Sequence, residues 1–580
     1  MISKLFFSLL PVQILIVAIS SINGIADGLM ASNFIGPDAM AVIGLYSPVI
    51  KIFETVNVVL LGGSQILCGQ FLGKNQIEKT QGIFTLDISL IVSFAAVLAA
   101  ICLVYPDQVA HMLSNDADIR SGLTDYIRGM APGILPQMLG TQLTVFLQIE
   151  QQSKRTYAGI MVMVATNLAL DYLFIRILGM SMLGLGLATT ISYMAFFVVL
   201  GIFYLSRKAI IKFNLHNVDV NETIPIIAIG IPGALTTFCL AIRGVILNAV
   251  LFSCSGNDGV SALSALNTCG YLLYAVTAGL AAATRLLVSV YIGEEDRTSL
   301  VTVMRTALLK GVAIVCAVSA AVMMFAGPIT YLFYKDTASQ VYYLTLWLFR
   351  IYPLCMPLSA ICAIFVNYYQ SSSRMGIVNL LSAFDGLLGI CIATVILAPL
   401  YGSIGVWIAH VVNGIITTLI VILYAWKVNG KAPSSVEDLL TIPDSFGVPE
   451  DKRIDISIHN ADEVANTSEL IMEFCKRNGV DRKRSYYAGL CMEEMAANIV
   501  EHGFDDEKKS HSADVRVVYK DDSLILRIKD DCKPFDPKEK LALIDPDDIT
   551  KNIGLRMVQR LAKTMSYTSM LGMNVLTMTI

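Results

Sequence analysis

About twelve long apolar stretches fill the first 430 residues of this 580-residue chain, and they limit its fold more than any other feature. Each stretch has about 20 residues or more, which is the length an α-helix needs to cross the hydrocarbon core of a bilayer. The stretches cover about residues 5–30, 44–72, 84–105, 124–149, 156–177, 181–205, 223–252, 260–291, 304–326, 340–370, 375–398 and 402–426. We therefore expect an all-α polytopic membrane domain with about twelve transmembrane helices.

The charged residues divide the chain into two unlike parts. The last 150 residues hold 48 of the 88 charged side chains, although they make up only a quarter of the length. This division places the first part in lipid and the second in water, so a wholly soluble enzyme is excluded. The formal net charge of −4 also excludes a strongly basic protein that binds nucleic acid. We expect a membrane domain at 1–430, a proline-containing linker at 431–453 and a soluble domain at 454–580.

Basic residues in the loops predict the orientation in the membrane, because basic loops stay in the cytoplasm. The opposite set of loops has few basic residues beyond Arg120, Arg176 and Lys335. The loops on the same side of the membrane as both chain ends contain many more basic residues, namely Lys4, Lys74, Lys79, Lys154, Arg155, Arg207, Lys208, Lys212, Arg297, Arg374, Lys427 and Lys431. We therefore expect a multi-pass protein of the plasma membrane, with both termini and the soluble domain in the cytoplasm.

A weak internal repeat is present in the membrane part. Residues 35–41 read IGPDAMA, and residues 255–261, about 220 positions later, read SGNDGVS. Each segment is followed by a long apolar stretch and then by a charged turn, at 73–75 and at 293–295. Two six-helix bundles in the same orientation are typical of transporters whose binding site lies between the two halves.

Polar residues inside the apolar stretches predict where function resides, because burying such groups in lipid is costly. Asp27 lies in the first stretch, Asn167 and Asp171 lie one turn apart in the fifth, and Thr189 lies in the sixth. Their oxygens suit H⁺ or Na⁺, so we predict a pocket for a coupling ion, although each residue could instead be a helix end that meets water. Further candidates are Lys51, Glu54, Arg243, Arg350 and Asp385.

Several of these segments resemble the multidrug and toxic compound extrusion (MATE) transporters. The resemblance covers about residues 1–430 and rests on ADGL at 26–29, GPDA at 36–39, TNLALDYLF at 166–174 and GLGLAT at 184–189. It implies two six-helix bundles around a central cavity, and export of a small, organic substrate against inward H⁺ or Na⁺. It also implies a coupling-ion site at Asp27, Asn167, Asp171 and Thr189. Related flippase families share this fold, so a lipid-linked substrate is an alternative.

Residues 454–580 alternate between strand and helix patterns. Apolar and polar residues alternate at 454–458, 513–519, 523–529, 565–570 and 573–580, as they do in half-buried strands. Helical periodicity covers 461–478, 482–502 and 554–563. Helices set apart from a largely antiparallel sheet form an α+β sandwich, and about 125 residues suffice for one core.

Three polar clusters in this part carry the chemistry. On the predicted helix at 482–502, Glu494, Asn498 and His502 share one face; an amide oxygen there can ligate Mg²⁺ and a carboxylate can act as a base. The segment DDCKPFDP at 530–537 follows a strand, and its first carboxylate can accept a hydrogen bond from an adenine amino group. The segment KNIGLR at 551–556 precedes a helix whose N–H groups can hold a phosphate.

The order of these clusters resembles the GHKL ATP-binding fold, and most closely its anti-sigma-factor serine-kinase branch. The resemblance covers about 454–580 and implies that ATP and Mg²⁺ bind there. It implies that Glu494 is the base, Asn498 the Mg²⁺ ligand and Asp530 the adenine reader. His502 and Phe535 would line the nucleotide, with Gly554 and Leu555 near the phosphates. In this sequence Cys532 replaces an expected glycine, and Lys551 and Asn552 stand where further glycines are usual.

The twelve cysteines are scattered along the chain, and many lie inside apolar stretches. Their spacing is not that of metal ligands, and they are too sparse for the disulfide framework of a small secreted protein. We expect the cysteines to be reduced and to fill space between packed membrane helices.

The predicted function is therefore an ion-coupled secondary antiporter that exports drugs or metabolites, with a cytoplasmic nucleotide-binding domain that regulates the transporter or signals to a partner protein. The chain has no Gly-x-x-x-x-Gly-Lys-Ser/Thr segment, which argues against a P-loop ATPase of the ABC type. The alternative from another class is a membrane-anchored sensor whose soluble domain phosphorylates a serine on a partner protein. Whether the protein is also an enzyme stays open at this point.

Overall fold

The computed structural model describes the whole chain apart from residues 1, 115, 207–208, 505–510, 521 and 543–552. The described residues form two compact units, a helical one over Phe6–Ile442 and a mixed one over Pro443–Ile580. Ten helical segments of the first unit are long and apolar enough to cross a membrane. The other two predicted stretches coincide with helix α1 (Ile2–Phe34) and with the pair α5 (Ala117–Met130) and α6 (Ile134–Ile149). The predicted polytopic helical domain is confirmed.

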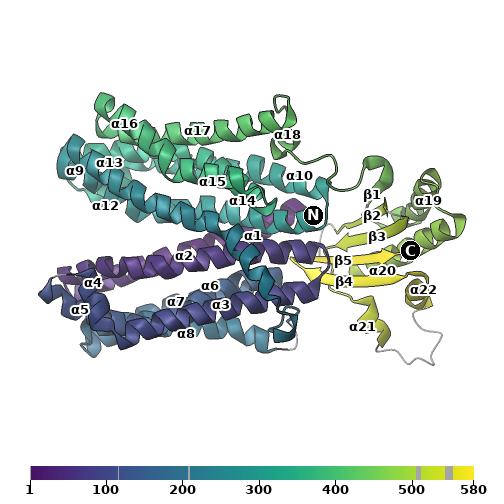
Figure 1. Cartoon of the computed structure of the whole chain (residues 1–580), viewed down its shortest axis with the longest axis horizontal. Helices are drawn as coiled ribbons and strands as arrows, with labels where there is room; N and C mark the ends of the chain where they lie inside the picture. Colours follow the sequence, from purple (N-terminus) through teal and green to yellow (C-terminus); the bar gives the residue numbers. More distant parts are fainter. Residues whose placement is uncertain (1, 115, 207–208, 505–510, 521, 543–552) are drawn as a thin grey trace. The chain divides into compact units, whose positions relative to one another are not determined.

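The helices of the first unit form two bundles, which lie one above the other in Figure 1. Besides α1, α5 and α6, the first bundle contains α2 (Pro37–Gly73), α3 (Ile77–Val104), α4 (Pro106–Leu113), α7 (Ser153–Asp171) and α8 (Ser181–Leu205). The second contains α9 (Thr223–Gly293), α10 (Arg297–Arg305), α11 (Val312–Met324), α12 (Ala326–Phe333), α13 (Gln340–Ile351), α14 (Met356–Ser371), α15 (Met375–Ala383), α16 (Gly389–Tyr401) and α17 (Ser403–Asn429). Helix α9 breaks at Ser255 and Gly256, so it holds the two stretches predicted at 223–252 and 260–291.

The internal repeat is visible in the backbone. A positive φ is rare for residues other than glycine, so a recurrence of such residues marks equivalent turns. Positive φ angles recur 220–223 residues apart in four pairs: Gly36 with Gly256, Asn75 with Glu295, Gln151 with Ser373, and Gly179 with Gly402. The two bundles therefore turn at equivalent places, as the short sequence echo predicted.

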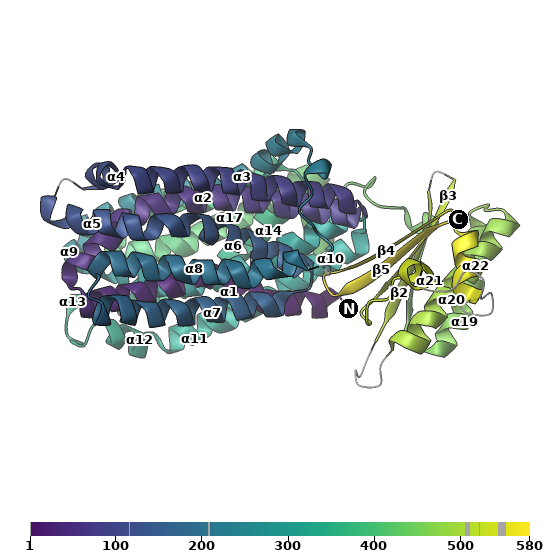
Figure 2. The same cartoon turned by 90° about the horizontal axis from the view of Figure 1, so that it is seen from below.

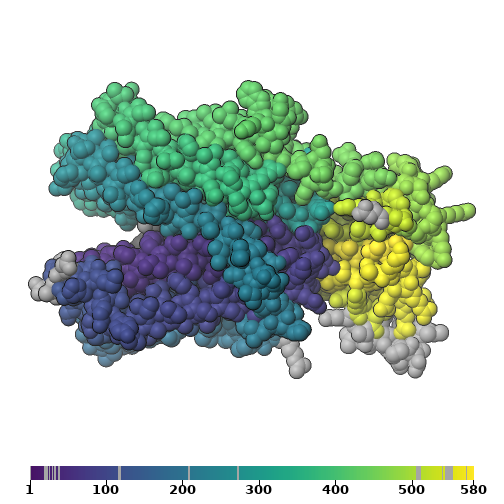
Figure 3. Space-filling model, in the orientation of Figure 1, coloured from purple at the N-terminus to yellow at the C-terminus, as the bar shows by residue number. Residues whose placement is uncertain are grey.

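The two bundles are separated by a cleft at one end of the unit and joined at the other (Figure 3). At the joined end the backbones of α2 and α9 approach so closely that a Cβ at Gly69 would overlap Ser289. Hydrogen bonds also cross between the bundles there. Gln70 donates to the carbonyl of Ser371 at 2.8 Å, and Arg285 donates to Gln65 at 2.6 Å. The turns around residues 75 and 295 lie at this joined end.

The second unit is a five-stranded antiparallel sheet with helices on one face (Figure 2). Its strands are β1 (Arg453–Ile458), β2 (Ala513–Lys520), β3 (Ser523–Asp530), β4 (Thr564–Met570) and β5 (Met573–Thr579), in the order β1-β2-β3-β5-β4. Its helices are α19 (Ala461–Arg477), α20 (Arg482–Gly503), α21 (Pro537–Ala542) and α22 (Ile553–Leu561). Alternate strand residues such as Val515, Leu526 and Met578 pack with Met492 and Val558 of the helices in one buried core. The predicted α+β sandwich is confirmed, with element ends within about two residues of the prediction.

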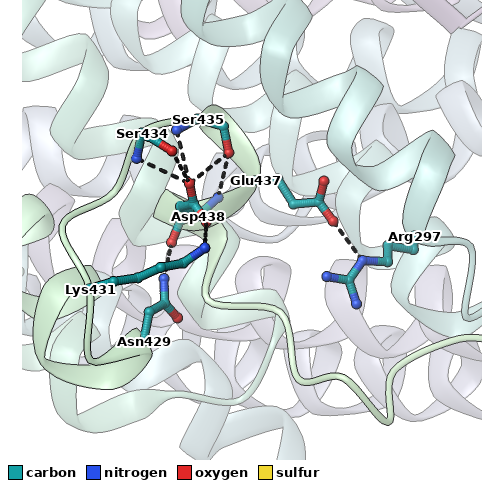
Figure 4. A network of polar contacts seen from close by, with 7 residues as sticks. All are labelled: Arg297, Asn429, Lys431, Ser434, Ser435, Glu437 and Asp438. Carbon is teal, nitrogen blue, oxygen red and sulfur yellow. Dashed lines mark hydrogen bonds and ion pairs between the residues drawn. The ribbon is translucent and has the colours of Figure 1, made fainter.

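The predicted linker starts as an ordered segment of the helical unit (Figure 4). Helix α18 (Val436–Leu440) begins with a capping box in which Ser435 and Asp438 satisfy each other's backbone N–H groups. The backbone N–H of Ser434 and nearby donors lower the pKa of Asp438, so its carboxylate stays ionised at neutral pH. The segment 431–442 therefore has a defined conformation, and the boundary of the second unit lies at Pro443.

Side chains of the second bundle hold α18 in place. Glu437 pairs with Arg297 at 2.7 Å. Tyr368 donates its hydroxyl hydrogen to the carbonyl of Leu440 at 2.8 Å, and Arg374 donates to the carbonyls of Leu440 and Thr441 at 3.2 and 2.5 Å. We refer to residues 431–442 with these contacts as the α18 clamp.

Candidate functional site

The four residues predicted to bind a coupling ion lie together inside the first bundle. Asp27 of α1, Asn167 and Asp171 of α7, and Thr189 of α8 are all buried, with exposed fractions of 6%, 0%, 0% and 3%. Thr189 donates to the Asp27 carboxylate at 3.0 Å, and Asn167 and Asp171 are the next polar neighbours of that carboxylate. Helix α1 thus meets α7 and α8, which lie more than 100 residues later in the chain, at one polar pocket.

Most oxygens of this pocket lack a donor. Among the described residues, no hydrogen-bond partner is found for Oδ1 of Asp27, Oδ1 of Asn167 or either carboxylate oxygen of Asp171. Buried polar atoms normally have a partner, and an unpaired buried charge costs several kcal/mol, on the order of 3–5. Two adjacent buried carboxylates with free oxygens therefore fit a proton or a small hard cation between them.

The local backbone explains how Asp171 reaches the pocket. It ends α7, and a π-helical turn, Tyr172–Ile177, follows it directly. A π-helical turn inserts an extra residue into the helix and changes the direction in which neighbouring side chains point; such turns are frequent at functional sites. Tyr126 of α5 lies within electrostatic range of both carboxylates, and its ring packs edge-to-face on Tyr46 with the ring centroids 5.2 Å apart.

The second bundle carries a different polar group beside a π-helical turn of its own. Asp385 lies in the π-helical turn Phe384–Leu388, 214 residues after Asp171. Asn413 of α17 donates to its carboxylate at 3.3 Å, and Arg243 of α9 lies within electrostatic range of Asp385 and of buried His410. The sequence singled out Asp385 and Arg243 but missed Asn413 and His410, which only the packing of α17 brings near.

The remaining predicted candidates have local partners. Lys51 pairs with Glu54 at 2.7 Å one turn away on α2, and the guanidinium of Arg350 lies over the Trp347 ring at 5.5 Å. A further buried carboxylate, Asp87 of α3, was missed by the sequence; Ser64 donates to it at 2.6 Å. The rule that found Asp27, an acidic residue inside an apolar stretch, would also have found Asp87.

In the second unit, Glu494 and Asn498 of α20 meet the start of α22. Asn498 donates to the backbone carbonyl of Glu494 at 2.8 Å and to its carboxylate at 3.3 Å. The Glu494 carboxylate lies directly against Gly554, where a side chain would collide with it. The predicted base and Mg²⁺ ligand are thus adjacent to the helix start that was predicted to hold phosphate.

Asp530 is fixed at the end of β3 by two donors. Its Oδ1 accepts hydrogen bonds from the Asn574 side chain at 2.7 Å and from the backbone N–H of Cys532 at 2.9 Å. Burial raises the pKa of Asp530, and these donors offset part of that shift. Both of these donors use Oδ1 and not Oδ2. Asn574, on the neighbouring strand β5, was missed because strand pairing, not sequence distance, brings it to Asp530.

The other predicted nucleotide contacts differ in their placement. Phe535 is 40% exposed, and its backbone N–H donates to the Tyr567 hydroxyl at 2.7 Å. His502 is exposed near the end of α20. The side chain of Leu555 is packed in the core and is only 3% exposed, so the prediction that it lies near the phosphates applies at most to its backbone. Lys551 and Asn552 lie outside the described residues.

Comparison with known families covers both units. Residues 13–173 and 232–395 match the family model MatE, and together they make up more than half of the chain. Residues 459–580 match the model of the histidine kinase-like ATPase domain. The two MatE stretches fall on the first and the second bundle, and the ATPase match covers the sheet and the helices packed on it.

Individual multidrug transporters are also similar to this chain. The chain is similar to the probable multidrug resistance protein YoeA of Bacillus subtilis (strain 168), with 21% identity over 61% of this chain and 79% of that protein. It is also 21% identical to the multidrug export protein MepA of Staphylococcus aureus (strain NCTC 8325 / PS 47), over 40% of this chain and 53% of MepA. A solved outward-facing multidrug resistance MATE family transporter of the MOP superfamily superposes with a TM-score of 0.68 at 20% identity, over 73% of this chain and 95% of that one. At that identity the superposition shows the fold.

Proposed function

Because the chain belongs to the MatE family, we propose that it is a secondary transporter that exports drugs or metabolites in exchange for inward-moving H⁺ or Na⁺. The observation that carries this proposal is the buried pocket of Asp27, Asn167, Asp171 and Thr189, most of whose oxygens lack a donor among the described residues. A proton or Na⁺ there would favour one arrangement of α1 against α7 and α8, and its release would favour another. The names of YoeA and MepA support a small organic substrate.

The cleft supplies the substrate path in this proposal. The turns at the joined end belong to the loops rich in lysine and arginine, such as those at Lys74 and Arg297, which the positive-inside rule places in the cytoplasm. The cleft would then open to the outside, in a plasma membrane that the chain crosses several times (Figure 3). A substrate in the cleft would be released outward, and ion binding would drive the return.

The histidine kinase-like ATPase domain would regulate this transport by binding ATP. Asn498 would ligate Mg²⁺, Asp530 would read adenine, and the backbone at Gly554 would approach the phosphates. Glu494 would act as the base of a phosphoryl transfer, and its position beside both Asn498 and Gly554 supports this role. The α18 clamp supports regulation within the chain, because the segment that leads to the domain is held on the second bundle as far as Thr441.

Reconstituted protein provides the direct test of transport. Proteoliposomes with an imposed pH or Na⁺ gradient should move a cationic dye, and an ionophore that collapses the effective gradient should stop the movement. ATP with Mg²⁺ on the side of the soluble domain should change the rate without replacing the gradient as the energy source. Dye movement that is independent of both gradients would contradict ion coupling, and movement driven by ATP alone would contradict secondary transport.

The α18 clamp provides the test of regulation. We expect Arg374→Ala to weaken the effect of ATP on transport by about 0.5–2 kcal/mol of coupling, because the variant removes the donors to the carbonyls of Leu440 and Thr441. ATP binding and transport without ATP should stay as in the unaltered protein. Lys427→Ala is the matched control, because this exposed cation lies in the last turn of α17. An unchanged ATP effect in Arg374→Ala would show that the clamp does not transmit it.

A further inference from the structure

Beside the proposed nucleotide site, three side chains of different chemistry converge. His511 precedes β2, and Asp531 and Cys532 follow β3. The antiparallel register pairs Ala513 with Asp530, so the residues just beyond this pair meet at one end of the sheet. Nδ1 of His511 lies 3.1 Å from Oδ1 of Asp531 and 3.8 Å from Sγ of Cys532. All three potential ligand atoms lie within 4.8 Å of one another.

The imidazole of this group is held rigidly. His511 is only 8% exposed, and its ring stacks on Phe504 with centroids 5.3 Å apart and planes inclined by 16°. Its second nitrogen, Nε2, is buried and has no hydrogen-bond partner among the described residues. A rigid ring whose Nδ1 faces a carboxylate and a thiol is a preorganised ligand, because little conformational freedom is lost when a metal binds.

The two separations measured from the His511 nitrogen fit a tetrahedral metal. Zinc bonds of about 2.0–2.1 Å to nitrogen, 2.0–2.2 Å to oxygen and 2.3 Å to sulfur imply separations between ligand atoms of about 3.3–3.6 Å. The observed 3.1 and 3.8 Å lie within a few tenths of an ångström of that range. A thiolate with an imidazole and a carboxylate favours a borderline metal such as Zn²⁺ over Mg²⁺, which prefers oxygen ligands.

We propose that His511, Asp531 and Cys532 form a binding site for a zinc-like divalent metal ion, with a fourth position open to water or another ligand. The site is separate from the Mg²⁺ that Asn498 would hold with the nucleotide. Cys532 stands where the resembling ATP-binding domains have glycine, so this chain has a thiol at a position where that pattern provides no ligand.

The metal would influence the position of Asp530, the residue proposed to bind adenine. The backbone N–H of Cys532 donates to Asp530, and its carbonyl accepts a hydrogen bond from Asn574 at 3.0 Å. A metal held by Asp531 and Cys532 therefore fixes the turn that sets the position of the Asp530 carboxylate. This second part rests on the proposed nucleotide binding, and we expect the metal to raise ATP affinity severalfold.

Cobalt substitution tests the site without relying on nucleotide. The full chain, purified in detergent with a histidine-free tag and stripped with a chelator, is titrated with Co²⁺. We expect one equivalent to give a thiolate-to-cobalt band in the near ultraviolet and the visible bands of a tetrahedral ion, and Zn²⁺ should displace it. Even outer-shell partners are worth about 10- to 100-fold in metal affinity, so loss of a direct ligand should cost more than about 100-fold.

Single variants identify the ligands. Cys532→Ser should lose the thiolate band, and His511→Gln should weaken Co²⁺ binding. Cys475→Ser and His459→Gln, which alter a thiol and an imidazole elsewhere in the same unit, should change neither, and thermal unfolding of each variant shows that it is folded. Absence of the thiolate band in the unaltered protein, or its survival in Cys532→Ser, would overturn the site and leave only a hydrogen bond between His511 and Asp531. If Co²⁺ gives the expected spectrum but the ATP affinity is the same with and without metal, the metal site stands and only its proposed effect on nucleotide binding is overturned.

Discussion

Asp27→Asn and Asp171→Asn should each abolish gradient-driven transport while the protein still folds and inserts. Each substitution preserves the shape of the side chain but removes the negative charge that attracts H⁺ or Na⁺. Because even a residue that only supports a cation ligand is worth about 10- to 100-fold in affinity, we expect at least a tenfold loss of gradient-driven uptake. The measurement is dye uptake by proteoliposomes with equal amounts of each protein.

The control for this experiment is Asp125→Asn. Asp125 lies in α5 of the same bundle, but its carboxylate is half-exposed and pairs with Arg128 at 3.7 Å, where a surface ion pair contributes little. Asp125→Asn should transport like the unaltered protein. If Asp27→Asn and Asp171→Asn also retain full uptake under both gradients, the buried pocket is not the coupling site. Asp87 and Asp385 would then be the next carboxylates to replace.

The sequence could predict the helices of the membrane unit because each one carries its own signal. A run of about 20 apolar residues identifies a span wherever it packs, and alternation of apolar and polar residues identified every strand of the second unit. Helix α9 breaks at Ser255 and Gly256, which is where the sequence repeats the segment 35–41. Local patterns of this kind do not depend on which other segment lies beside them.

Contacts between distant segments could not be predicted in the same way. Asp27, Asn167, Asp171 and Thr189 were singled out as polar residues inside apolar stretches and again by the family resemblance, but only the packing of α1, α7 and α8 shows that they meet. Asn574 acquires its place beside Asp530 from the pairing of β3 with β5. The distance between two residues along the chain does not show which strands pair or in which register.

The same reason explains two features that the sequence does not show. His511 lies 21 residues from Cys532, and only the pairing of β2 with β3 brings the two together, so cysteine spacing gives no sign of the metal site that we propose. Residues 431–453 were predicted to be a linker because prolines lie there among serine, aspartate and glycine. The structure adds that 431–442 is held in a defined conformation by Arg297, Tyr368 and Arg374, whose partners in this segment lie more than 60 residues later in the chain.

Asp530→Asn should lower ATP affinity strongly while the folded unit stays at least as stable. The new side chain keeps an Oδ1 that can accept from Asn574 and Cys532, so the turn is preserved. Its amide nitrogen replaces Oδ2, and a donor then faces the donor of the adenine amino group. Since a hydrogen bond to a charged group contributes about 1.5–3 kcal/mol, we expect an affinity loss of about 10- to 100-fold, measured by calorimetric titration with ATP and Mg²⁺.

The pH dependence of stability separates this effect from misfolding. Burial raises the pKa of Asp530 above the ordinary value of 3.8, so the folded state holds this proton more tightly than the unfolded state. The contribution of Asp530 to stability is therefore complete below pH 3.8 and is lost as the pH rises through the raised pKa. Asparagine carries no charge, so Asp530→Asn should gain stability relative to the unaltered protein as the pH rises, as measured by thermal unfolding of the second unit. Asp514→Asn, on the neighbouring strand β2, should show neither the affinity loss nor this gain. Unchanged ATP binding in a folded Asp530→Asn would remove Asp530 as the adenine reader.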